Sequence, residues 1–285
     1  MRVFFAVLRR ELADAVTSPF GQRLTIIHLA VSASAVFLGW PISYTLGRAN
    51  AAPTLAWWVY AEIVVLSYLA LAVPANIFPI EDKIRTGDWI VYGEAPIWAV
   101  YLGKTLASLL ALAFWLLTVI PIFFTALAIS PISIEQLQFL GLFVGLLLTT
   151  MVQLGTWIGV TVDSQTFRIV AVDVAFVAIM LGSILLQSLS GSFHIPIYAQ
   201  PLEVAARIMN ITVRDALVGS AAGTLVGLSV PLTTTPAASV SDSVPWGPLI
   251  VIYGSLLVFF LALSLLSLRQ WRQNSGKEGA YFDPR

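Results

Sequence analysis

The chain has 285 residues, of which 58% are hydrophobic and 11% are charged, and its formal net charge is zero. Soluble domains carry about 25% charged residues because their surface must be solvated, so this composition, with a mean hydropathy of +0.89, excludes an ordinary soluble domain. The absence of cysteine excludes disulfides, thiol catalysis, thiolate zinc sites and iron–sulfur clusters. Several apolar runs exceed the ~18 residues needed to cross a bilayer, which predicts an all-α polytopic membrane protein.

Residues 2–18 predict an amphipathic helix that lies in the membrane interface and does not cross it. Phenylalanines, leucines and a valine gather on one face of this helix, with Arg9 and Arg10 largely off it. Such arginines contact anionic lipid head groups, so membrane lipids are expected partners. Ser18-Pro19 is expected to end the helix, because the residue before proline is pushed away from helical backbone angles.

Six apolar stretches predict membrane spans within a single transmembrane domain covering residues 1–285. These spans are expected at 24–45, 55–79, 96–129, 137–162, 169–189 and 247–268. Residues 190–246 form an outer segment, in which the apolar stretch 216–232 is expected to re-enter the membrane or lie in its interface as a hairpin. Residues 269–285 form a charged tail.

Seven of the 30 charged residues fall between Ile80 and Lys104, although the flanking stretches are almost purely apolar. We call residues 80–95 the charged segment; its candidate contact residues are Glu81, Asp82, Lys83, Arg85, Gly87, Asp88 and Glu94. One interpretation is a solvated loop with interfacial aromatic residues. The other is a docking element for a separate partner that supplies energy. Lys104 lies inside the third span, where a lysine near a helix end extends to the interface.

The placement of lysine and arginine predicts the orientation in the membrane. With both termini inside, twelve of these residues lie on the cytoplasmic side and three lie outside. The charged segment is therefore expected in the cytoplasm. The zero net charge gives no indication of a nucleic-acid partner, and none is expected.

Four polar residues in the predicted spans are candidates for a transport pathway or for helix packing. Glu62 lies about one turn inside its span, where an interfacial carboxylate is expected, with a transport role as the alternative. Asp173 is expected to form a structural pair with Arg168. Gln153 and Gln187 are expected to form hydrogen bonds between helices, with substrate contact as the alternative.

Several catalytic and nucleotide-binding patterns are absent from the sequence. There is no G-x-x-x-x-G-K-[ST] for ATP, no H-E-x-x-H and no G-x-S-x-G. With only His28 and His194, we expect no histidine-based metal or acid–base site. No cofactor is therefore expected in this chain, and an enzyme is disfavoured.

The order of these motifs resembles the membrane subunit of type-2 ABC exporters. Leu8-Arg9-Arg10-Glu11-Leu12 followed by Ser18-Pro19 is similar to that family's interfacial elbow helix. The charged segment, with Ala95-Pro96 and Gly103-Lys104 after it, is similar to the family's first cytoplasmic loop. Val162-Asp163-Ser164-Gln165 is similar to its second cytoplasmic contact, in which Asp163 and Ser164 would touch the partner. Gly87-Asp88-Trp89-Ile90 departs from the family pattern, where a threonine and a leucine-rich run more often follow.

The resemblance implies that the charged segment forms a coupling helix seated in a cytoplasmic ABC ATPase subunit. ATP and magnesium would be bound by that ATPase, and a second copy of this chain or a related permease would complete the complex in a bacterial or archaeal cell membrane. The few charges within the spans suggest an amphipathic or lipid-like cargo. The alternative functions are an ion- or proton-coupled secondary transporter, which would need carboxylates near the midplane, and a membrane scaffold that transports nothing.

Overall fold

The computed structural model describes residues 2–40, 53–77, 96–130, 132–162, 164–180, 200–209, 244 and 246–278. Within these ranges the secondary structure is entirely helical. The helices are α1 (Arg2–Thr17), α2 (Pro19–Leu38), α3 (Thr54–Ile77), α5 (Ile97–Thr118), α6 (Ile120–Ile129), α7 (Ile134–Thr161), α8 (Gln165–Met180), α10 (Pro201–Met209) and α14 (Trp246–Glu278).

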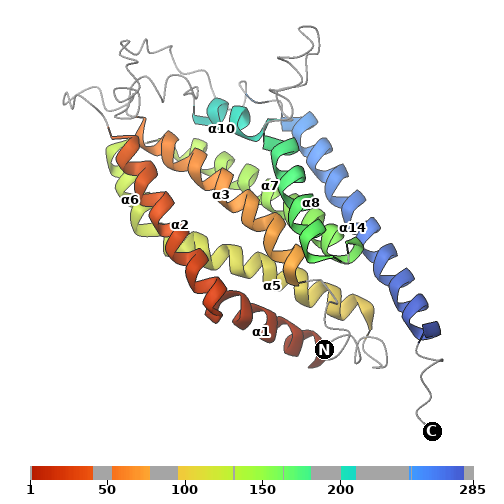
Figure 1. Cartoon of the computed structure of the whole chain (residues 1–285). Helices are drawn as coiled ribbons and strands as arrows, with labels where there is room; N and C mark the ends of the chain where they lie inside the picture. Colours follow the sequence, from red (N-terminus) through yellow and green to blue (C-terminus); the bar gives the residue numbers. More distant parts are fainter. Residues whose placement is uncertain are drawn as a thin grey trace.

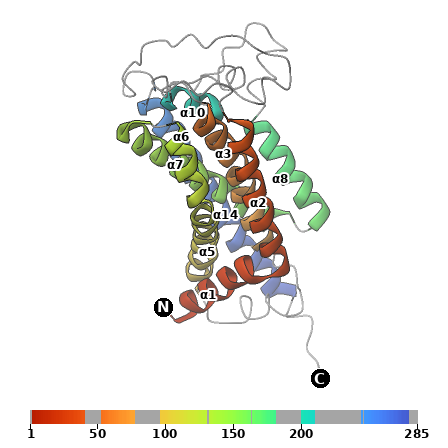
Figure 2. The same ribbon diagram turned by 90° about the vertical axis from the view of Figure 1, so that its left-hand side faces the viewer.

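Five of the described helices are long and apolar enough to cross a membrane, namely α2, α3, α5, α7 and α14. They run lengthwise through an elongated bundle (Figure 1). Two views agree that α1 and the C-terminal end of α14 lie at one end of this bundle, which we call the base, whereas α10 lies at the other end (Figures 1 and 2). The prediction of a multi-pass, all-α membrane protein agrees with this arrangement.

Helix α3 forms the centre of the bundle. It packs against α2, α5, α6, α7, α8 and α10, and 67% of its most apolar stretch is buried, compared with 17% for α14. A helix that is apolar on all sides is typical of such a central position. The closest approach is to α7, where a Cβ added at Gly155 would lie 2.3 Å from the carbonyl oxygen of Leu71. Glycine therefore allows α3 and α7 to pack backbone to backbone.

The first predicted span begins earlier than expected. Helix α1 ends at Thr17, as Ser18-Pro19 indicates, but α2 starts immediately at Pro19 and not near Leu24. Proline suits the first turn of a helix because its missing N–H has no partner there. The Ser18 side chain also accepts a hydrogen bond from the Gly21 amide, which is a typical N-cap.

The third predicted span, 96–129, is two helices and not one. Helix α5 ends at Thr118 and α6 begins at Ile120, with Pro121 in its first turn. Proline removes a backbone donor and clashes with the preceding turn, so the helix breaks just before it. The expectation of one continuous helix was wrong because it gave this proline no weight.

Two helices extend beyond their predicted ends. Helix α7 begins at Ile134, before the predicted start of its span at position 137, because Ser133 and Gln136 form a reciprocal capping box there. Helix α14 continues past position 268 to Glu278, through part of the predicted tail.

The remaining predicted elements lie partly outside the described residues. Helix α8 begins at Gln165 and is described to Met180, which covers the first half of the predicted span 169–189. In the outer segment, α10 is a short helix on which Glu203 and Arg207 form an ion pair of 3.3 Å. The predicted hairpin at 216–232 lies outside the described residues.

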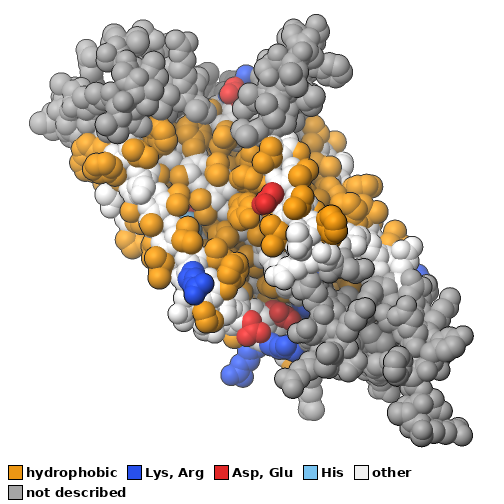
Figure 3. Space-filling model, viewed as in Figure 1, with side chains coloured by type: hydrophobic (Ala, Val, Ile, Leu, Met, Phe, Trp, Pro, Cys, Tyr) orange, Lys and Arg blue, Asp and Glu red, His pale blue; other side chains and the backbone are white. Residues whose placement is uncertain are grey.

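The face of the molecule shown in Figure 3 is mostly hydrophobic across its middle. Most of the charged side chains visible on this face gather toward the base, where α1 lies. This distribution is typical of a bundle whose middle contacts lipid and whose ends contact water or head groups.

Candidate functional site

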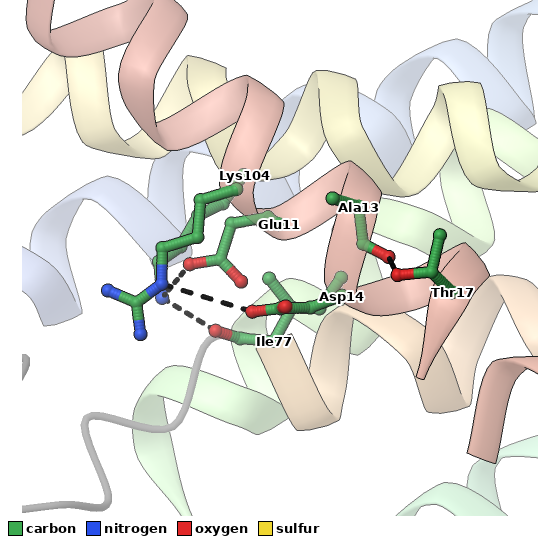
Figure 4. Close-up of polar contacts among 7 residues, drawn as sticks. Glu11, Ala13, Asp14, Thr17, Ile77 and Lys104 are labelled. Carbon is green, nitrogen blue, oxygen red and sulfur yellow. Dashed lines mark hydrogen bonds and ion pairs between the residues drawn. The ribbon is translucent and has the colours of Figure 1, made fainter. Parts of the chain in front are cut away.

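The base of the bundle contains a buried lysine that joins three helices. Lys104 of α5 lies 3.6 Å from Oε1 of Glu11 on α1, measured from its Nζ atom. The same Nζ donates a hydrogen bond of 2.6 Å to the carbonyl oxygen of Ile77, the last residue of α3. Figure 4 shows the Glu11 carboxylate and the Ile77 carbonyl both beside the ammonium. We call Glu11, Ile77 and Lys104 the basal clasp.

Physical chemistry accounts for each contact of the basal clasp. The carbonyl of Ile77 belongs to the last turn of α3, where the carbonyls lack partners within the helix and the helix dipole is negative. A cation is favoured at that position. The side chains of Lys104 and Glu11 are only 8% and 14% exposed, so each charge is compensated mainly by the other. Lys104 is therefore enclosed by α1 and the end of α3 and does not point freely into solvent.

The neighbouring glycine lets α1 approach α5. A Cβ added at Gly103 would lie 3.1 Å from Cγ1 of Val7 and 3.3 Å from the carbonyl oxygen of Phe4. A larger residue at position 103 would push α1 away and lengthen the contact between Lys104 and Glu11. The pair Gly103-Lys104 thus positions α1 across the start of α5.

On the outer side of α1, Arg9 and Arg10 are exposed. Arg10 forms only a long ion pair of 3.9 Å with Asp14, which is also exposed and is drawn beside the clasp in Figure 4. Of the three residues expected in the interfacial helix, the two arginines therefore face outward, whereas Glu11 faces the protein. The sequence pattern did not separate these two roles.

The basal clasp joins the two helices that flank the charged segment in the sequence. Ile77 ends α3 just before that segment, and α5 begins just after it at Ile97. A small apolar cluster of Tyr101, Val160 and Leu268, with Ile77 and Ile97 packed against it, joins these ends to α7 and α14. The candidate contact residues Glu81, Asp82, Lys83, Arg85, Gly87, Asp88 and Glu94 themselves lie outside the described residues.

The second predicted contact with a partner is described only in part. Asp163 lies outside the described residues, whereas Ser164 is exposed, and its carbonyl accepts the first backbone hydrogen bond of α8, from Arg168. The buried Arg168 side chain donates through Nε and Nη2 to the carbonyl of Val162, which caps the end of α7. Arg168 thus holds the turn between α7 and α8 in place.

The predicted pair of Asp173 with Arg168 is wrong. Asp173 is exposed and accepts a hydrogen bond of 3.2 Å from the hydroxyl of Tyr68 on α3. Arg168 and Asp173 are five positions apart in α8, a spacing that puts them on different faces of a helix. Asp173 therefore links α8 to α3.

The other two polar candidates are Gln153 and Gln187, and the structure describes only Gln153. Gln153 of α7 is buried and accepts a hydrogen bond from the hydroxyl of Tyr101 on α5. This contact joins two helices, and it lies next to the apolar cluster at the base. Gln187 lies outside the described residues.

Glu62 is not an interfacial carboxylate but is buried between α2 and α3. Its Oε2 atom lies 2.7 Å from Nε2 of His28, and its Oε1 atom accepts a hydrogen bond from the hydroxyl of Ser32. The His28 and Glu62 side chains are 1% and 5% exposed. The spacing of His28 and Ser32, one helical turn apart in an apolar stretch, is the sequence signal that could have indicated this site.

The arrangement at Glu62 differs from that of a serine hydrolase. Such a site places the imidazole between the serine and the carboxylate, so that the imidazole takes the serine proton. Here the carboxylate lies between His28 and Ser32 and binds both. Ser32 is therefore not activated as a nucleophile. In the part of the chain that the structure describes, histidine, aspartate and glutamate form no group of three suited to a metal ion.

No model of a known protein family and no curated protein sequence matches this chain.

Proposed function

We propose that this chain is the membrane subunit of an ATP-driven exporter of the type-2 ABC class. A separate cytoplasmic ATPase would bind ATP and magnesium and would dock on the charged segment. The cargo would be an amphipathic or lipid-like molecule, since Asp173 is the only exposed acidic residue in the described middle parts of the helices. Two such membrane subunits would form the pathway.

The observation that supports this proposal best is the basal clasp. Lys104 fixes the end of α3 to the start of α5 through the Ile77 carbonyl, and it fixes both to α1 through Glu11. A displacement of the charged segment would therefore act on three helices at once. Coupling of this kind needs a rigid connection between the docking element and the spans, because a flexible linker would absorb the movement.

A charge-reversal experiment tests the proposed docking element. We expect Glu81→Arg and Asp82→Arg to abolish or strongly reduce the amount of ATPase that co-purifies with the tagged chain from membranes of the source cell. Glu135→Arg is the matched control, since this carboxylate is exposed at the opposite end of α7. Retention of the ATPase by both charged-segment variants, at the level of Glu135→Arg, would contradict the docking role.

Proton-coupled transport without an ATPase is a second candidate function, favoured by one observation. The pair of His28 and Glu62 is the kind of buried carboxylate site that such a transporter needs. Uptake or release of cargo by the purified chain in liposomes, driven by a pH gradient alone, would support this function and not the first.

A further inference from the structure

Two titratable side chains meet deep inside the helical bundle. At a rise of 1.5 Å per residue, His28 lies about 14 Å from the start of α2, and Glu62 lies about 12 Å from the start of α3. Both helices are candidate membrane spans. Ionisable groups at such depth are costly, and they more often serve a function than stability.

No other charged group in the described part of the chain compensates this pair. Helix α6, which packs on both α2 and α3, carries no charged residue. On α2 itself, Arg23 is exposed and lies more than one turn nearer the base than His28. On the other packed elements, the described ionisable groups are Arg9, Arg10, Glu11 and Asp14 of α1, Tyr60 and Tyr68 of α3, Tyr101 and Lys104 of α5, Glu135 of α7, Arg168 and Asp173 of α8, and Glu203 and Arg207 of α10.

The contacts of these groups keep them from His28 and Glu62. Lys104 belongs to the basal clasp, Asp173 binds Tyr68, and Glu203 pairs with Arg207. His28 Nε2 and Glu62 Oε2 lie 2.7 Å apart, and neither side chain contacts a third charged group among the described residues. Among the described residues, the charge of the pair is therefore balanced only within the pair itself.

The balance depends on one proton. With a neutral imidazole and an ionised carboxylate, the pair carries a net charge of −1 among buried groups, which is unfavourable. With one proton more, carried either on the imidazole or on the carboxyl group, the pair is neutral overall. The two states of the pair differ by one proton, which is taken from water or returned to it. No other bond forms or breaks.

The second ring nitrogen of His28 shows that the hydrogen bonds at this site are incomplete. Nδ1 of His28 is buried and has no hydrogen-bond partner among the described residues, which is unfavourable in either protonation state. Histidine is the side chain whose charge changes most readily near neutral pH. Ser32, the third member, donates a hydrogen bond to the carboxylate.

We propose that His28, Ser32 and Glu62 form a proton-binding site between α2 and α3 that takes up and releases a single proton. Loss of the proton leaves a buried negative charge and weakens the contact between the two helices. Its gain restores a neutral, hydrogen-bonded pair. This inference does not depend on the proposed ATPase, and the isolated chain is sufficient to test it.

The experiment uses the two histidines of the chain. His194→Gln leaves His28 as the only imidazole, so that ¹⁵N NMR of histidine-labelled protein in lipid nanodiscs reports its protonation directly. Infrared difference spectra of the same samples report the protonated carboxyl group. We expect one of these signals to change within the pH range in which the protein stays folded, and Glu62→Gln to abolish the change or shift its midpoint.

Two further variants make the outcome decisive. Glu135→Gln removes an exposed carboxylate and should leave the midpoint unchanged. Ser32→Ala keeps both titrating groups but removes the hydroxyl that binds Glu62, so it should move the midpoint; this variant serves if Glu62→Gln does not fold. Signals that stay constant over the whole range, or a midpoint that neither Glu62→Gln nor Ser32→Ala moves, would overturn the proposal.

Discussion

Lys104 has an environment that is unusual for a lysine at the end of a membrane span. Burying an ammonium costs several kcal/mol, and here the carboxylate of Glu11 and the helix-end carbonyl of Ile77 offset that cost. Both partners are needed, because either alone would leave a largely buried charge without full compensation. The three groups therefore act as one unit.

Removal of the lysine should destabilise the base of the bundle. Lys104→Met leaves Glu11 largely buried without its cation, so we expect a loss of about 2–4 kcal/mol in the free energy of unfolding. Adding Glu11→Gln to this variant should recover part of the loss, because the uncompensated charge is then removed as well. Thermal or denaturant unfolding of the purified chain in detergent measures both effects.

A matched variant at an exposed ion pair provides the control. Arg10→Gln breaks the pair of Arg10 with Asp14, which is solvent-exposed, and should change the stability by less than about 0.5 kcal/mol. Equal losses for Arg10→Gln and Lys104→Met, or no recovery in the double variant, would show that the basal clasp does not work as described.

At the scale of single residues, the sequence indicated which polar groups are exceptional but not what they contact. Glu62 and Lys104 were both expected near the interface, because each lies within a few turns of a span end. Their partners, His28 and Glu11, are far away in the chain, and no local periodicity connects them. Burial of both pairs depends on how α1 and α2 pack against α5 and α3, which a single sequence does not specify.

Among the helices, the contact of α3 with α7 depends on a small residue at one position. A Cβ at Gly155 would lie 2.3 Å from the Leu71 carbonyl oxygen and 2.8 Å from Cγ of Pro74. We expect Gly155→Ala to destabilise the protein by about 1–3 kcal/mol, because the two backbones must separate. Thermal unfolding in detergent measures this loss.

The same helix offers the control for this substitution. A Cβ at Gly145 would meet nothing within 4 Å, so Gly145→Ala should be neutral or stabilising by up to about 1 kcal/mol through helix propensity. Similar changes in stability for the two alanine variants would contradict the close packing of α3 on α7.

The packing of α1 on α5 is open to a direct chemical test, because the chain contains no cysteine. A Cβ at Gly103 would lie 3.2 Å from Cβ of Val7, close to the separation of about 3.5–4.5 Å in disulfides. We expect Val7→Cys/Gly103→Cys to form a disulfide under mild oxidation, detected by a shift in gel mobility that reductant reverses.

For comparison, Val7→Cys/Gly254→Cys pairs the same position on α1 with an open site on α14 and should remain reduced. If the two double variants cross-link equally, α1 does not lie along α5 as described.

The sequence predicted the helices better than their ends. The spans that became α2, α3, α7 and α14 follow from apolar length alone. Their ends depend on caps, such as Ser18 before α2 and the capping box of Ser133 before α7. These short signals were present in the sequence but were outweighed by hydropathy, and the break at Pro121 was missed for the same reason.

For the whole molecule, the arrangement of helices brings the two helix ends that flank the proposed docking element, the end of α3 and the start of α5, to the basal clasp. The ends of α3 and α7 and the start of α5 share an apolar cluster, and α1 lies at the same end of the bundle (Figures 1 and 2). Counting lysine and arginine predicts that this end faces the cytoplasm. A partner bound there would contact the charged segment and the turn between α7 and α8 together.

Reconstitution of the purified chain into liposomes, with and without the ATPase that co-purifies with it, tests the central claim most directly. The measurement is the movement of a fluorescent lipid-like probe across the membrane after ATP and magnesium are added. We predict movement only when the ATPase, ATP and magnesium are all present, and its loss in Glu81→Arg. Equal movement by the chain alone, without any nucleotide-binding partner, would contradict the account.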